Sequence, residues 1–79
     1  MVTIKNIVRN GNIASCDFYP EDWETCGSIE VDLTSNEIIN KVYPLNGCLE
    51  RYPFYAKREL VRVVTSGKKI PEKSINMWY

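Results

Sequence analysis

Two apolar-rich runs lie on either side of Asn10-Gly11, and this pattern of apolar and polar positions predicts a β-hairpin. An Asn-Gly pair between two apolar-rich runs is a strong signal for a two-residue turn, because both residues tolerate a positive φ. We therefore expect strands near residues 2–9 and 12–19. Such a loop implies two cross-strand pairs: Val8 with Ile13, and Ile7 with Ala14. Neither face of this hairpin is cleanly polar, which predicts a helix over one face and a loop or a partner over the other.

The next periodic segment, residues 28–43, fits two patterns. Thr34 and Glu37 have the spacing of a helix capping box, which would start a short helix. Against this, apolar and acidic residues alternate over residues 29–33, which is typical of a half-buried strand. A loop at residues 35 and 36 would give three consistent pairs: Leu33 with Ile38, Ile29 with Val42, and Glu30 with Lys41. Three pairings outweigh one capping motif, so we predict a second hairpin.

A helix is predicted after the sequence LNG. Pro53 suits a first helical turn, and Gly67 suits a position just beyond the last one. At 100° per residue, four apolar residues fall in one stripe that should meet the sheet: Ala56, Leu60, Val63 and Val64. Arg58 and Arg62 lie on the opposite side of the helix.

The final segment, KSINMWY, alternates Ile75, Met77 and Tyr79 with Asn76 and Trp78 after a proline that ends the helix. A docking tail would need no such period, so we predict a fifth strand. The fold class expected is α+β, in the order ββββαβ: a small antiparallel sheet of four or five strands with one helix packed on one face. The strand order in the sheet does not follow from the pattern.

Length and composition narrow the class of protein. A chain of 79 residues is expected to form a single domain over residues 1–79. No stretch reaches the length of a membrane span and the N-terminal residues lack the apolar run of a signal peptide, so we expect a cytoplasmic protein without membrane contact. The formal net charge is zero, but residues 1–50 carry −5 and residues 51–79 carry +5. This asymmetry could serve a polyanion-binding element or the docking of one half on the other.

The residue types present exclude several kinds of site. The chain has no histidine and three widely spaced cysteines, Cys16, Cys26 and Cys48. We therefore expect reduced thiols, no zinc site and no Ser-His-Asp or Cys-His catalysis. Cys26 or Cys48 could act as a nucleophile only with a lowered pKa, and the sequence shows no means of lowering it. We predict no enzyme activity and no cofactor.

Two segments are candidate binding sites. In the loop PEDWETCG, Trp23 could anchor an interface, and Glu21, Asp22 and Glu24 would select a basic partner. The alternative is that Trp23 folds back as a lid over the sheet. On the helix, a basic face could follow a nucleic-acid backbone while an aromatic side chain stacks on bases: Phe54, Lys57, Arg58, Val61, Arg62, Lys68 and Lys69. The alternative there is an ordinary solvated helix face.

The function predicted from these features is a small intracellular, non-enzymatic binding module that acts through protein contacts with an unknown partner. The first alternative is a nucleic-acid-associated accessory protein that uses the helix. The second is a homo-oligomeric structural protein, for example a homo-dimer that pairs an exposed edge strand or buries Ile7 and Phe18 against a second copy.

Overall fold

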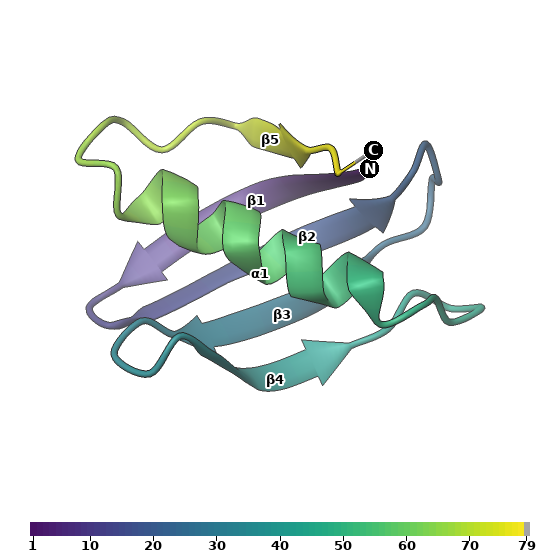
Figure 1. The fold of residues 1–79 in the computed structure, drawn as a ribbon, viewed down its shortest axis with the longest axis horizontal. Helices are drawn as coiled ribbons and strands as arrows, with labels where there is room; N and C mark the ends of the chain where they lie inside the picture. Colours follow the sequence, from purple (N-terminus) through teal and green to yellow (C-terminus); the bar gives the residue numbers. More distant parts are fainter. Residues whose placement is uncertain (79) are drawn as a thin grey trace.

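In the computed structural model, which describes residues 1–78, five antiparallel strands form one sheet and one helix lies across a face of that sheet (Figure 1). The elements are β1 (Val2–Asn10), β2 (Ile13–Pro20), β3 (Gly27–Asp32), β4 (Glu37–Val42), α1 (Arg51–Val64) and β5 (Lys73–Asn76). The predicted order ββββαβ is confirmed. The strands lie side by side in the order β4-β3-β2-β1-β5, so the last strand joins the first, and β4 and β5 form the two edges.

The hairpin of β1 and β2 turns one residue later than predicted. Asn10 pairs with Ile13, so Gly11 and Asn12 form the loop, and the predicted pairs Val8–Ile13 and Ile7–Ala14 are wrong. Of the two loop residues, only Gly11 has a positive φ, of 63°. This φ pattern is that of a type II′ turn, which needs glycine only at its first central position. The glycine, and not the Asn-Gly pair, therefore sets the register.

A β-bulge in β1 changes the faces on which its side chains lie. Asn6 and Ile7 together lie opposite one residue of β2, Cys16, and Asn6 has a φ of 53°. The Asn6 amide donates a hydrogen bond of 2.7 Å to Asp17 Oδ2, which favours this conformation. Ile7, the second residue of the bulge, packs against the core, while Val8, the residue that follows, is exposed.

The second hairpin exists, but its register also differs from the prediction. Asp32 pairs with Glu37, which leaves a four-residue loop, and the three predicted pairs are wrong. The observed pairs include Val31 with Ile38, Glu30 with Asn40 and Ile29 with Lys41. The loop closes through hydrogen bonds to Asp32, whose side chain accepts from the Thr34 backbone and whose carbonyl accepts from Asn36. Thr34 therefore belongs to an Asx-type turn rather than a helix cap.

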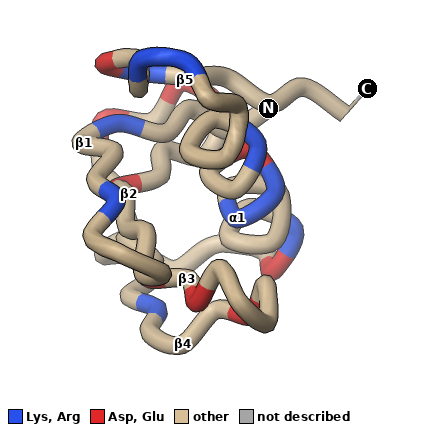
Figure 2. Tube along the Cα trace, turned by 90° about the vertical axis from the view of Figure 1, so that its left-hand side faces the viewer, with Lys and Arg blue, Asp and Glu red and all other residues tan. Residues whose placement is uncertain are grey.

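The core lies between α1 and one face of the sheet. Ala56, Leu60, Val63 and Val64 are buried, which confirms the predicted helix stripe. Facing them, the largest fully buried side chains of the sheet include Phe18 and Ile4. Within residues 1–78, α1 lies over one face and no helix or strand lies over the other, which we call the uncovered face (Figure 2). In that part of the chain, no helix has the length and apolar character needed to cross a membrane.

The predicted fifth strand is confirmed for residues 73–76, which pair with β1. Its faces are assigned by register: Asn76 lies opposite the buried Val2, so Ser74 and Asn76 face the helix and Ile75 is exposed. Trp78 follows the strand and packs against the core, with its ring stacked on Tyr55 at 4.4 Å between centroids. The alternation predicted for Tyr79 lies outside the described residues.

Gly27, at the start of β3, lies where two other groups leave no room for a side chain. A Cβ atom there would lie 2.3 Å from the Val42 carbonyl oxygen and 2.6 Å from the Phe18 ring. We expect Gly27→Ala to lower the free energy of unfolding by about 1–3 kcal/mol, since β4 would have to move. Urea unfolding monitored by circular dichroism measures this. Ser28→Ala, one residue along the same strand, is the matched control and should change the free energy of unfolding by less than about 0.5 kcal/mol. Gly47→Ala would not serve as a control, because Gly47 has a positive φ.

Candidate functional site

The first candidate site is a groove beside Trp23, on the uncovered face of the sheet. It has a volume of about 460 Å³, and we call it the Trp23 groove. Trp23 is 40% exposed, so it does not fold back as a closed lid. The loop is held by a hydrogen bond of 2.9 Å from the Trp23 backbone N–H to the Pro20 carbonyl, and Glu21 adopts a φ of 48°. On its other side, the indole lies 6.3 Å from the Tyr52 ring.

Glu21, one of the predicted partner-selecting carboxylates, holds the fold together. Its Oε2 atom accepts hydrogen bonds from the N-terminal ammonium at 2.9 Å and from the Tyr52 hydroxyl at 2.8 Å. Burial and this hydrogen bond raise the pKa of Tyr52, which therefore stays a donor at neutral pH. Glu21 thus ties the start of β1 and the first turn of α1 to the Trp23 loop. Asp22 and Glu24 remain as the carboxylates of the groove.

The Trp23 groove carries charges of both signs. Within residues 1–78, Asp22 and Glu24 make no ion pair. Lys5 and Lys73, which lie directly opposite each other on β1 and β5, also line the groove. The Lys5 ammonium lies 4.8 Å from the centre of the Tyr19 ring. The groove therefore offers apolar rings and exposed charges side by side, as protein interfaces do.

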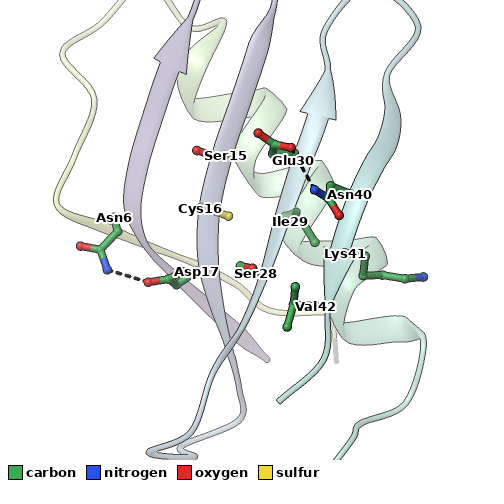
Figure 3. Close-up of a pocket in the computed structure, with 10 residues that line it drawn as sticks. All are labelled: Asn6, Ser15, Cys16, Asp17, Ser28, Ile29, Glu30, Asn40, Lys41 and Val42. Atoms are coloured by element: carbon green, nitrogen blue, oxygen red, sulfur yellow. Dashed lines mark hydrogen bonds between the residues drawn. The ribbon is translucent and has the colours of Figure 1, made fainter. Parts of the chain in front are cut away.

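The middle of the uncovered face has a second, polar hollow that sequence analysis missed (Figure 3). It has a volume of about 300 Å³ and contains two carboxylates, Asp17 and Glu30. Each is held by an amide: Asn6 donates to Asp17, and Asn40 donates to Glu30 at 3.3 Å. The first pair depends on the bulge in β1, and the second lies beside a bulge at Ile39 in β4, so a regular alternation did not reveal them. In the described part of the chain, no group of three or more Cys, Asp or Glu side chains could hold a metal ion.

The predicted basic face of the helix is partly assembled by the fold. Arg58 and Arg62 are exposed, and with Lys57 and Val61 they line a depression of about 330 Å³. Asn36, from the loop between β3 and β4, completes that depression and was not predicted, because its approach to the helix depends on tertiary packing. Lys68 and Lys69 lie beyond the end of α1 and do not line it.

Glu59, the acidic residue of α1, is buried although its side chain is charged. It is 2% exposed and accepts hydrogen bonds from Arg62, Ser74 and Asn76. Burial raises the pKa of Glu59, but the hydrogen bonds and the Arg62 charge outweigh burial and hold this pKa below its usual value of 4.5. The one carboxylate of α1 is therefore withdrawn from the surface, and the charged side chains that the helix exposes are all cationic.

Within residues 1–78, no ion pair joins the acidic half of the chain, residues 1–50, to the basic half. The three ion pairs formed within residues 1–78 are the N-terminus with Glu21, Lys41 with Glu50, and Arg62 with Glu59. Each pair joins residues of the same half. Figure 2 shows cationic segments of α1 on the side away from the sheet. The charge asymmetry therefore remains on the surface.

Other predicted surface residues have different positions. Phe18 is fully buried under α1, so its side chain offers no surface to a second copy, and Ile7 packs beside the core. Burial raises the pKa of the Cys16 thiol to about 12, and burial also raises the pKa of Cys48.

Comparison of the chain with protein-family models, curated proteins and solved structures found no match.

Proposed function

We propose that this protein is a small, non-enzymatic binding module that acts in the cytosol through protein contacts at the Trp23 groove. The observation that carries this proposal is the Trp23 indole, which is 40% exposed on the wall of a groove of about 460 Å³. Large, rigid aromatic side chains at such positions often dominate the binding energy of an interface.

The chemistry of the groove defines the partner it would accept. Trp23 and Ile75, which is 46% exposed, form an apolar surface for a partner's apolar side chain. Asp22 and Glu24 lie beside that surface and would attract a cationic side chain. The partner is therefore a protein segment in which basic residues flank an apolar one.

The cysteines support the non-enzymatic part of the proposal and the cytosolic location. All three thiols are free, which suits a reducing compartment. A nucleophilic cysteine needs a lowered pKa, whereas burial raises the pKa of Cys16 and of Cys48. The chain also has no histidine to act as a general base near neutral pH.

A peptide of alternating leucine and arginine tests the proposed site. In an NMR titration of the full chain, we expect the Trp23 indole N–H and the amides of residues 3–5, 22–24 and 73–75 to shift. Trp23→Ala should weaken binding by about thirtyfold, the loss of a typical hot-spot side chain. Glu24→Gln should weaken it by a few fold, and the effect should decrease with added salt.

The matched control is Glu37→Gln, which removes an exposed carboxylate at the far edge of the sheet. This variant should bind the peptide as the unmodified chain does. Equal losses for Glu24→Gln and Glu37→Gln would indicate unspecific attraction to acidic groups and would contradict the proposal. Shifts centred on the hollow around Asp17 and Glu30 would contradict it too.

A further inference from the structure

A third hollow surface lies between the outer side of α1 and β4, away from the Trp23 groove. It consists of two depressions of about 380 Å³ and 330 Å³. Phe54 lines the first and Lys57 lines the second, and the Lys57 ammonium lies 5.3 Å from the centre of the Phe54 ring, so the two adjoin. We call this surface the α1–β4 groove, and its main lining residues are Ile38, Phe54, Lys57, Arg58, Val61 and Arg62.

The charge of the α1–β4 groove is positive. Lys57, Arg58 and Arg62 surround the second depression, and no carboxylate lines it. Glu59, the one acidic residue of α1, is buried behind the groove and holds Arg62 in place through two of the guanidinium nitrogens. Arg62 Nη2 also donates to the Ser74 hydroxyl at 3.4 Å. The Arg62 side chain is still 65% exposed, and within residues 1–78 no group accepts from Nη1, whose N–H groups are available to a ligand.

The first depression has one carboxylate, and internal partners engage it. Glu50 accepts a hydrogen bond of 3.0 Å from the Lys41 ammonium and another from the Tyr43 hydroxyl. Arg51 adds a further cation to the same depression. The groove therefore attracts anions along its whole length.

The floor of the groove is apolar and includes an exposed aromatic ring. Phe54 is 48% exposed, with the Lys57 ammonium 5.3 Å from the ring centre and the Tyr55 ring 5.2 Å away between centroids. Ile38 and Val61, which are half-buried, continue the apolar surface on either side. A flat ring between cations suits a ligand that carries both an aromatic plane and negative charges.

We infer that the α1–β4 groove binds single-stranded nucleic acid, with a base against Phe54 and the neighbouring phosphates at Lys57, Arg58 and Arg62. Stacking on one ring is tolerant of sequence, because every base has a π-face. The base must be unpaired, since the face of a paired base is covered by its neighbours in the duplex. Phosphate contacts from three cations give weak, salt-dependent binding without base readout. This inference concerns a different surface from the Trp23 groove and does not depend on the protein partner proposed there.

Fluorescence anisotropy of a labelled oligothymidylate of about 15 nucleotides, titrated with the full chain at about 20 mM salt, tests the inference. We expect saturable binding, with a slope of log affinity against log salt of about −2 for three phosphate contacts. Phe54→Leu should weaken binding by about fivefold or more. Arg58→Gln should reduce the slope by about 0.7, the loss of one phosphate contact. Urea unfolding of both variants checks that the fold is retained, as expected for exposed positions.

Lys69→Gln is the matched control because it removes an exposed lysine beyond the end of α1, outside both depressions of the groove. It should leave both the affinity and the salt slope unchanged. Absence of binding at low salt, or equal effects of Lys69→Gln and Arg58→Gln, would overturn the inference. Competition by a hexaglutamate peptide as strong as by unlabelled oligothymidylate, together with no effect of Phe54→Leu, would instead indicate a surface for acidic proteins and would also overturn it.

Discussion

Replacing Phe18 with alanine should lower the free energy of unfolding by about 3–5 kcal/mol, the usual cost of a large cavity in a core. Phe18 is fully buried on β2, near the middle of the sheet, and it is among the largest of the buried side chains. Its ring also fills the space over Gly27, which has no side chain to close the cavity. For a domain of this size, such a loss is a large part of the total stability. Urea unfolding followed by circular dichroism gives the change directly.

Val8→Ala is the matched control for the Phe18 variant. Val8 belongs to the neighbouring strand β1, but it is 55% exposed on the uncovered face. Its replacement should change the free energy of unfolding by less than about 0.5 kcal/mol. Similar losses in the two variants would mean that the uncovered face is also packed, and the assignment of one core to one face would be wrong.

The elements of this fold were predictable because each has a strong local period. The helix stripe of Ala56, Leu60, Val63 and Val64 needs only the angle of 100° per residue, and all four are buried. The last strand was predictable from alternation after Pro71, although its helix-facing residues are the polar Ser74 and Asn76. These polar residues face inward because Glu59 lies opposite and accepts hydrogen bonds from both.

The strand registers were not predictable because they depend on single residues that leave the regular pattern. Asn6 and Asn36 both adopt a positive φ, the first in a bulge and the second in a loop. Asn36 lies in the four-residue loop that sets the register of β3 and β4. The bulge at Asn6 shifts the pairing of β1 with β2 by one residue from the register that Gly11 sets at the turn. The face of every later side chain on that strand then depends on the displacement, which is why Val8 is exposed while Ile7 packs against the core.

The candidate sites were predictable to the extent that they lie within one segment. Trp23 and its acidic neighbours are consecutive, and the fold leaves Asp22, Trp23 and Glu24 together on one groove. The approach of Asn36 to Lys57 and the withdrawal of Glu59 from the surface require the packing of α1 on the sheet. In the sequence, Glu59 counts against a basic helix face, whereas in the structure it leaves that face positive and orients Arg62.

The pair of Glu59 and Arg62 leads to the second large expected effect. Arg62→Gln should lower the free energy of unfolding at pH 7 by about 3 kcal/mol, because it leaves a buried carboxylate without its cation. This is the lower end of the usual range, since Arg62 is largely exposed and Ser74 and Asn76 still donate to Glu59. Glu59→Gln removes the charge itself and should cost only about 1 kcal/mol.

The pH dependence of the Arg62 variant distinguishes this mechanism from a loss of packing. In the unmodified chain the pKa of Glu59 is lowered, so its contribution to stability is present above about pH 4.5 and is lost as the pH falls through the folded-state pKa. Without Arg62, burial dominates and the pKa of Glu59 rises, so protonation near pH 4 relieves the buried charge. The stability difference between Arg62→Gln and the unmodified chain should therefore shrink from pH 7 to pH 4. Urea unfolding at the two pH values measures it, and an equal difference at both would show that Arg62 stabilises the fold through its aliphatic contacts rather than its charge.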